Sequence, residues 1–189
     1  MVCFDETNRQ LIAERRQALP LKAGQAARYD DEYVRNGVAN LFMLFEPLAN
    51  RREVSVHQRR TAKDFAQCLR ELSQIHYPDA EKIIVVMDNL NTHSLSSLYV
   101  AFEPQEARRL CERFEIHYTP KHGSWLTMAE LEISVMSRQC LQRRIPTIET
   151  LSVEVHSWVS QRNSLKSTVH WQFSASDARL KLSHLYPPI

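Results

Sequence analysis

The stretch EKIIVVMDNLNTH, residues 81–93, runs through five consecutive apolar residues into Asp88 and then turns polar. A short apolar run of this kind, rich in β-branched residues and bounded by polar ones, is typical of a strand covered on both faces. The pattern therefore predicts a central strand of a sheet with helices above and below it. It also places a carboxylate at the end of the most buried strand, where a rigid scaffold would fix its position.

The segments around this strand alternate between extended and helical patterns. Apolar residues recur at helical spacing over 61–76, with Thr61 as the N-cap, and two β-rich runs before them form a hairpin pattern. The chain opens on a short strand that closes at Asp5, and the polar stretch from there to Gly37 is expected to be an extended excursion. We expect the hairpin strands at 38–49 and 52–58, a further strand at 115–119, and helices at about 94–102, 104–114, 127–143, 147–163 and 176–185. This order predicts an α/β fold, with a mixed central sheet flanked by helices.

Length and composition indicate one soluble globular domain. The chain has 189 residues, of which 43% are apolar and 24% are charged, and these values are ordinary for such a domain. No apolar run approaches the roughly 18 residues of a membrane helix, and the N-terminus lacks a signal-peptide pattern, so we expect a cytoplasmic protein without a membrane partner. The four cysteines are widely spaced, which argues against a disulfide framework or a zinc site.

Arginines gather in two stretches although the net charge is only +2. One stretch spans 51–60 and the other spans 138–144. Such clusters can follow the phosphates of a nucleic acid. A solvated charged face is the simpler explanation for either cluster taken alone.

Three acids fall at the ends of predicted elements. Asp5 closes the first strand, Asp88 closes the apolar strand, and Glu130 lies in the first turn of a helix that begins near Thr127. Taken singly, each has an ordinary explanation as a turn former, the start of a polar loop or a favourable charge at a helix N-terminus. If the two strands pair, however, the three carboxylates converge and repel one another unless cations are present. Oxygen ligands of this kind suit Mg²⁺ or Mn²⁺, and two such ions can act together on a phosphodiester.

Three segments around these acids resemble the acidic motifs of a known family. They are CFDE (3–6), VVMDNLNTH (85–93) and YTPKHGSWLTMAELE (118–132), and they are similar to the motifs of the DDE transposases of the mariner-related bacterial insertion-sequence family. The resemblance extends through RYDDEYVRNGVANLF (28–42), SRQCLQRRIPTIETL (137–151) and DARLKL (177–182). It therefore covers nearly the whole chain, and it implies an RNase H-like fold.

The resemblance also implies roles for the acids. Asp5, Asp88 and Glu130 match the catalytic, metal-binding residues of the family, which act with Mg²⁺ or Mn²⁺ in a two-ion site. Glu132 is the rival for the third position. Two residues along a helix correspond to about 200° of rotation, so Glu130 and Glu132 cannot both face the metals. We prefer Glu130, because LTMAE stands where the wider superfamily has Leu-Asn-Pro-Ile-Glu.

The activity implied by the resemblance is DNA cleavage at transposon ends followed by strand transfer into target DNA. The expected partners are double-stranded DNA and a second copy of the chain, in the bacterial cytoplasm at the nucleoid. The family's N-terminal helix-turn-helix modules are absent from residues 1–189, which read as a single catalytic domain, so a separate helix-turn-helix polypeptide is a further expected partner. Residues 168–189 are expected to form a tail that packs on the core.

Several polar and aromatic residues are candidates for contact with DNA. Asn89 and His93 flank Asp88, and either could orient a water or touch a phosphate; a capping role for the segment is the alternative. Trp125 could stack on an unpaired base, or anchor the core. The remaining candidates are Lys121, His122, Arg138, Arg143 and Arg144. Two other functions stay open: an inactive remnant that only binds DNA or protein, and an RNase H-like nuclease that cuts without joining.

Overall fold

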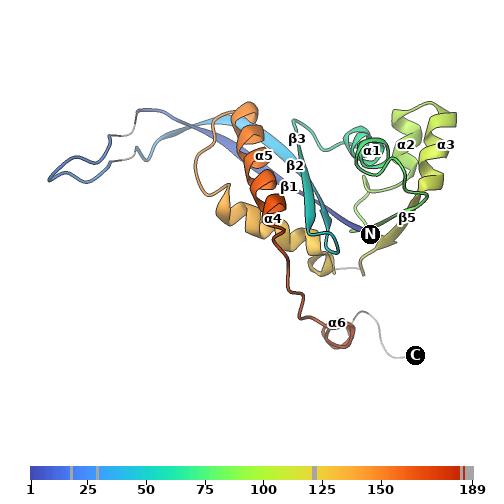
Figure 1. Cartoon of the computed structure of the whole chain (residues 1–189). Helices are drawn as coiled ribbons and strands as arrows, with labels where there is room; N and C mark the ends of the chain where they lie inside the picture. The colour runs from blue at the N-terminus through green and yellow to red at the C-terminus, as the bar shows by residue number, and fades with distance from the viewer. Residues whose placement is uncertain (18, 29, 121–122, 184, 186–189) are drawn as a thin grey trace.

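A five-stranded mixed sheet forms the centre of the computed structural model, which describes residues 1–17, 19–28, 30–120, 123–183 and 185. The strand order is β3-β2-β1-β4-β5 (Figure 1). β2 runs antiparallel to β1 and β3, whereas β4 runs parallel to β1 and β5. The strands are β1 (Val2–Glu14), β2 (Tyr33–Glu46), β3 (Arg51–His57), β4 (Ile83–Met87) and β5 (Phe114–Tyr118). The predicted mixed sheet is confirmed.

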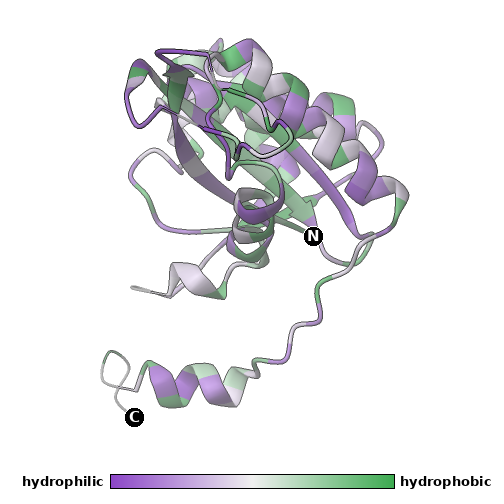
Figure 2. Ribbon diagram, turned by 90° about the vertical axis from the view of Figure 1, so that its left-hand side faces the viewer, coloured by the Kyte–Doolittle hydropathy of each residue, from purple (hydrophilic) through white to green (hydrophobic). Residues whose placement is uncertain are grey.

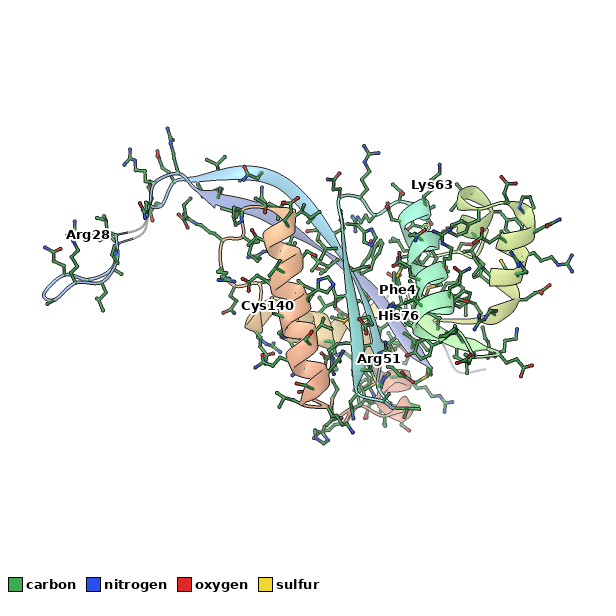
Figure 3. All side chains as sticks on the ribbon, turned by 45° about the horizontal axis from the view of Figure 1, so that its top comes forward. Phe4, Arg28, Arg51, Lys63, His76 and Cys140 are labelled. Atoms are coloured by element: carbon green, nitrogen blue, oxygen red, sulfur yellow. The ribbon has the colours of Figure 1, made fainter. Side chains whose placement is uncertain are left out.

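The first strand is much longer than its sequence indicates, and Asp5 lies inside it rather than at its end. β1 pairs with β2 from Cys3 as far as Glu14. Beyond the helices this pair becomes a two-stranded ribbon that projects from the molecule and carries Arg28 near its tip (Figures 1 and 3). The ribbon faces solvent on both sides, so it needs no apolar alternation, and the extended excursion expected here contains longer paired strands than the sequence indicated.

A break in register separates the ribbon from the body of the sheet. The pairing of β1 with β2 shifts between Gln10 and Ile12, as in a β-bulge. At this point Leu11 is buried and the Ile12 backbone N–H donates to the Ile145 carbonyl at 2.8 Å. The strand is therefore anchored to the rest of the fold where the ribbon begins.

The predicted hairpin of β2 and β3 is confirmed. The strands end at Glu46 and resume at Arg51, and Asn50 in the connecting turn has a φ of 54°. Asparagine tolerates this left-handed conformation better than most residues, because its short side chain can bond locally. The turn therefore forms without a glycine.

Helices cover the two faces of the sheet, as Figure 1 shows. On one side lie α1 (Ala62–Glu71), a π-helical turn η1 (Leu72–His76), α2 (Ser96–Ala101) and α3 (Pro104–Arg113). On the other lie a short 3₁₀ turn η2 (Ser124–Leu126), α4 (Met128–Gln139) and α5 (Ile148–Ser164). None of the helices in the described part of the chain is long and apolar enough to cross a membrane.

Two apolar clusters fill the spaces between the sheet and its helices. Because successive strand residues point to opposite faces, β1 sends Phe4 toward α1 and Cys3 toward α4. β2 likewise sends Phe42 to the first cluster and Met43 to the second. Residues at the start of β1 thus define both cores, which is why Asp5, next after Phe4, is held so firmly.

Two more of the predicted elements, β4 and α4, differ from the structure. β1, not β4, is the middle strand, and β4 is buried on one face only, with Ile84 36% exposed on the other. The cause is that α4 lies against β1 and β2. α4 also ends at Gln139 rather than near Arg143, since the chain then turns to bury Leu141 and Ile145.

The N-caps of α1 and α4 follow the sequence signals, whereas α2 and α3 have no side-chain cap. Thr61 forms a capping box with Asp64, as its position before α1 predicts. Thr127 caps α4 and accepts a hydrogen bond from the Glu130 backbone N–H at 3.3 Å. Each cap satisfies backbone donors that the first helical turn cannot pair.

The chain continues past α5 as an extended segment that ends in α6 (Ala175–Lys181), which stands apart from the main body (Figure 2). No side chain of α6 is buried, although Leu182 just after it is. Phe173 contacts the Trp125 ring at a centroid distance of 5.1 Å, and Lys181 Nζ lies 4.8 Å above that ring. Both contacts are made with η2, which precedes α4.

Candidate active site

The first two acids lie side by side because their strands pair in parallel. Val2 is in register with Val85, and Cys3 with Val86. Continuing that register by two residues places Asp5 beside Asp88. Asp5 shares a sheet face with Cys3, which packs in the cluster under α4, so its carboxylate points toward the start of that helix.

Thr127 joins the first acid to the third. Its hydroxyl donates to Asp5 Oδ2 at 3.2 Å and accepts from the Glu130 backbone N–H at 3.3 Å. Thr127 is fully buried, whereas Glu130 is exposed. The sequence identified Thr127 only as a helix start; its place three residues before an acid, in an N-cap, was the available signal.

The three carboxylates are close enough to influence one another. Burial raises the pKa of Asp5 to about 6, and the charges of Asp88 and Glu130 add to this effect. Hydrogen bonds from the Glu6 backbone N–H, at 2.8 Å, and from Thr127 work in the opposite direction. Ionising Asp5 is therefore costly in the absence of a nearby cation.

His93 orients Asp88 from within the core. Its Nδ1 lies 2.5 Å from Asp88 Oδ1, and its ring packs 5.0 Å from those of both Phe4 and Phe65. This hydrogen bond is the main reason that the pKa of Asp88 is lowered. Burial opposes the charged form of His93, but Asp88 and Glu6 outweigh it and raise the pKa of His93 to about 9. The side chain is 0% exposed, so it does not reach a phosphate as the sequence suggested.

A second acid and a surface arginine stand behind His93. Glu6 Oε2 lies 3.5 Å from His93 Nε2, and Glu6 Oε1 accepts from Arg60 at 2.9 Å. Glu6 follows Asp5 directly and therefore points to the opposite sheet face. Sequence reasoning missed Glu6, although the Asp-Glu doublet in a strand was a signal that both faces carry an acid.

The rival third acid has a different surrounding. The Glu132 carboxylate is 0% exposed and lies 3.1 Å from Arg52 Nε and 2.9 Å from an Arg162 nitrogen. Arg52 is itself fully buried, so neither alternative for its cluster, phosphate contact or a solvated charged face, applies to it. Glu132 therefore points into the core between α4, β3 and α5, while Glu130 lies on the side of Asp5.

Within the described residues, no group of three or more His, Cys, Asp or Glu side chains stands in an arrangement that would hold a metal ion as it is. The donor chemistry nevertheless fits a divalent cation. Asp5, Asp88 and Glu130 offer only oxygen ligands, and burial together with repulsion from the other two acids raises the pKa of Asp5, a cost that such an ion relieves.

Some of the candidate DNA-contacting side chains are exposed, whereas others already contact residues of this chain. Asn89 is exposed in the turn after β4, and Arg138 is exposed near the end of α4. Arg144 bonds to Glu14 at 2.6 Å, and Trp125 is packed against the tail. Lys121 and His122 lie outside the described residues.

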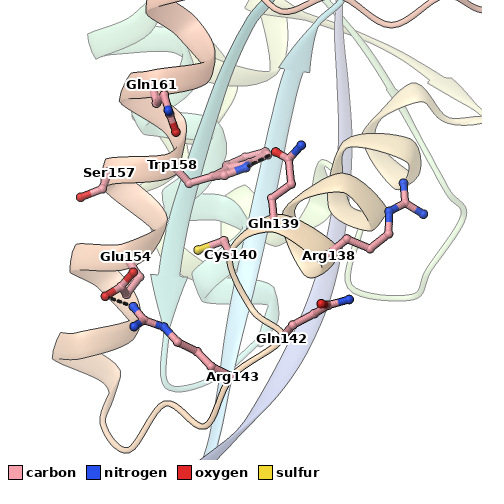
Figure 4. A pocket seen from close by; sticks show the side chains of 9 residues that line it. All are labelled: Arg138, Gln139, Cys140, Gln142, Arg143, Glu154, Ser157, Trp158 and Gln161. Atoms are coloured by element: carbon pink, nitrogen blue, oxygen red, sulfur yellow. Dashed lines mark hydrogen bonds and ion pairs between the residues drawn. The ribbon is translucent and has the colours of Figure 1, made fainter. Parts of the chain in front are cut away.

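A pocket of about 470 Å³ lies between the end of α4 and α5, and none of the three candidate acids lines it (Figure 4). Arg138 and Arg143 line it, and Arg143 forms an ion pair with Glu154 across it. On its floor the Trp158 indole donates to Gln139 Oε1 at 3.0 Å. The second arginine cluster is thus partly neutralised by acids from other elements.

Comparisons with known proteins identify a family and a shared fold. The family model of the DDE superfamily endonuclease matches residues 1–152. The Mos1 mariner paired end complex with Mn matches with a TM-score of 0.59 and 14% identity, covering 87% of this chain and 49% of that one. The Mos1 strand transfer complex matches with a TM-score of 0.57 and 14% identity, covering 84% and 46%. A pre-cleavage Mos1 transpososome matches with a TM-score of 0.55 and 13% identity, covering 87% and 54%.

These structural matches establish the RNase H-like fold that the sequence resemblance implied. The chain spans about half the length of the Mos1 chain in the first of these structures. No curated protein sequence matches this chain significantly.

Proposed function

Because this chain belongs to the DDE superfamily endonuclease family, we propose that it is the catalytic domain of a transposase that cuts DNA at transposon ends and joins them to target DNA. The observation that carries the proposal is the convergence of Asp5, Asp88 and Glu130 on one side of the sheet, with Thr127 bonded to both Asp5 and the Glu130 backbone. The matched Mos1 paired-end and strand transfer complexes support the same reaction.

In this proposal Asp5 and Asp88 hold the first of two Mg²⁺ or Mn²⁺ ions, and Glu130 completes the second site. The metal supplies activation of a water or 3′-hydroxyl and stabilises charge on the phosphodiester oxygens. Thr127 orients Asp5, and His93 fixes one carboxylate oxygen of Asp88. A paired-end Mos1 complex containing Mn supports the choice of ion.

Double-stranded DNA is the proposed substrate. Asn89 and Arg138 are the exposed candidates to contact it, and Arg143, Arg144 and Trp125 would do so only by exchanging present partners. A second copy of the chain and a separate helix-turn-helix polypeptide are further proposed partners, and these rest on the family resemblance alone.

Metal-dependent nicking of supercoiled plasmid tests the catalytic role without knowledge of the end sequence. We expect nicking in Mn²⁺ that is abolished by EDTA and by Asp88→Asn, and joining of pre-cut ends when the terminal sequences flanking the gene are supplied. Nicking that survives Asp88→Asn contradicts the assignment. Salt-sensitive DNA binding without any cleavage, indifferent to Mg²⁺ and to Asp88→Asn, would instead identify a non-catalytic DNA-binding protein.

A further inference from the structure

Glu132 is the most deeply buried acid of α4 and has no part in the proposed site. It lies two residues after Glu130, on the far side of the helix, and its side chain is 0% exposed. Arg52 of β3 reaches it at 3.1 Å, and Arg162 of α5 reaches it at 2.9 Å. The three residues, called here the buried triad, tie α4 to β3 and α5.

The arginines of the buried triad are themselves fixed. Arg52 donates to the Ser167 carbonyl at 2.7 Å, and its backbone exchanges two hydrogen bonds with the Asn163 side chain, at 2.9 and 2.8 Å. Its guanidinium lies 5.1 Å above the Phe45 ring, and Arg162 lies 5.6 Å above that of Trp158. Glu132 is therefore held against a rigid frame.

Stability alone does not explain such a group. Burying three charges is costly, and replacing a buried ion triad by apolar residues of similar volume is often neutral or stabilising. The triad's charged contacts are directional, and they restrict the rotation of α4 about its own axis. The other buried residues of α4, Ala129, Ile133 and Met136, make apolar contacts that do not fix a helix's rotation strongly.

Small rotations of α4 matter at Glu130. The Cα atoms of a helix lie about 2.3 Å from its axis and a glutamate carboxylate about 6 Å from it, so a turn of about 10° moves that carboxylate by about 1 Å. Catalytic groups must be placed within about 0.5 Å. We propose that Glu132, gripped by Arg52 and Arg162, is a positioning residue that sets the rotation of α4 and so aims Glu130 at the metal site. The inference rests on the proposed function.

The test replaces the buried triad in the full chain by apolar residues, Arg52→Met, Glu132→Leu and Arg162→Met together. We expect the urea midpoint in EDTA to stay within about 0.3 M of the wild type or to rise. Mn²⁺ binding, measured by calorimetry without DNA, and the single-turnover nicking rate should each fall about tenfold or more, the usual loss when a supporting partner of a metal site is removed.

A matched control removes an exposed pair of the same residue types, Arg108→Met with Glu112→Leu on α3, and should change none of the three measurements. A triple variant whose urea midpoint, Mn²⁺ affinity and nicking rate all match those of the wild type overturns the inference. If the triple variant does not fold, Arg162→Gln takes its place, since Arg162 is 15% exposed and can lose its charge at the rim of the triad. Wild-type Mn²⁺ affinity in that folded variant also overturns the inference.

Asp88→Asn is assayed in parallel to separate the two claims. If Asp88→Asn still nicks DNA, the proposed function fails. If Asp88→Asn is inactive while the triple variant is fully active, only the positioning role of Glu132 fails.

Discussion

Replacing Asp5 by Asn should stabilise the metal-free protein while abolishing its activity. The folded protein raises the pKa of Asp5 from 3.8 to about 6, so the ionised carboxylate is disfavoured in the fold at pH 7 by about 3 kcal/mol, at 1.36 kcal/mol per pH unit. Asparagine keeps the acceptor for the Glu6 N–H but turns an amide toward Thr127, which costs about 1 kcal/mol. The expected gain is therefore about 1–2 kcal/mol at pH 7 in EDTA.

The pH dependence carries the same information. Because the folded state holds its proton to a higher pH than the unfolded state, the wild type loses stability as the pH rises from about 4 to about 6, and the penalty is constant above that. Asp5→Asn should remove this slope. Urea unfolding in EDTA across this pH range measures both effects, and added Mg²⁺ should stabilise the wild type but not Asp5→Asn.

Asp88→Asn is the informative comparison. The pKa of Asp88 is lowered by His93, so removing its charge should destabilise the protein at pH 7 even though the same activity is lost. An Asp5→Asn protein that is no more stable than the wild type at pH 7 in EDTA would refute the reasoning, because it would mean that burial and the neighbouring acids do not disfavour the ionised Asp5.

Three further predictions concern the surroundings of the acids. The raised pKa of His93 adds to the free energy of unfolding below about pH 6.5, and this contribution is lost as the pH rises through about 9. Asp88→Asn should flatten that decline in urea titrations. Thr127→Val should lower the free energy of unfolding by about 2–4 kcal/mol, because it removes the cap of α4 and the hydrogen bond to Asp5. Thr147→Val removes only the cap of α5 and should lower it by about 1 kcal/mol. Equal losses would contradict the link that Thr127 makes between Asp5 and α4. Phe65→Ala should cost about 3–5 kcal/mol by thermal or urea unfolding, since it opens a cavity beneath His93, and a loss below about 1 would show that the site closes over it.

The parts of the site that the sequence predicted are those encoded locally. Asp88 follows an unmistakable apolar strand, and Glu130 follows an N-cap threonine. The partner of Glu132 could not be predicted, because Arg52 stands 80 positions away and looked like one of several surface arginines. The same holds for His93, whose burial depends on Phe4 and Phe65 meeting from separate elements.

The extent of the first strand was missed for a different physical reason. A two-stranded ribbon with solvent on both sides satisfies its backbone hydrogen bonds without burying the side chains of either face. Residues 6–37 therefore show no alternation of apolar and polar residues. The first strand was expected to end at Asp5 because the residues after it showed no such signal. The pairing of β1 with β4 was only a condition for the convergence of the acids, and the structure shows that these two strands pair in parallel.

Because of the break in register at Leu11, the length of the ribbon does not affect the position of the first acid, Asp5. A slip of one residue in β1 would turn Asp5 to the opposite face of the sheet, away from Thr127. The bulge between Gln10 and Ile12, with Ile12 bonded to Ile145, holds the strand on the inner side of the ribbon. The ribbon can therefore lengthen, shorten or change its contacts over the course of evolution while the chemistry at its root stays in place.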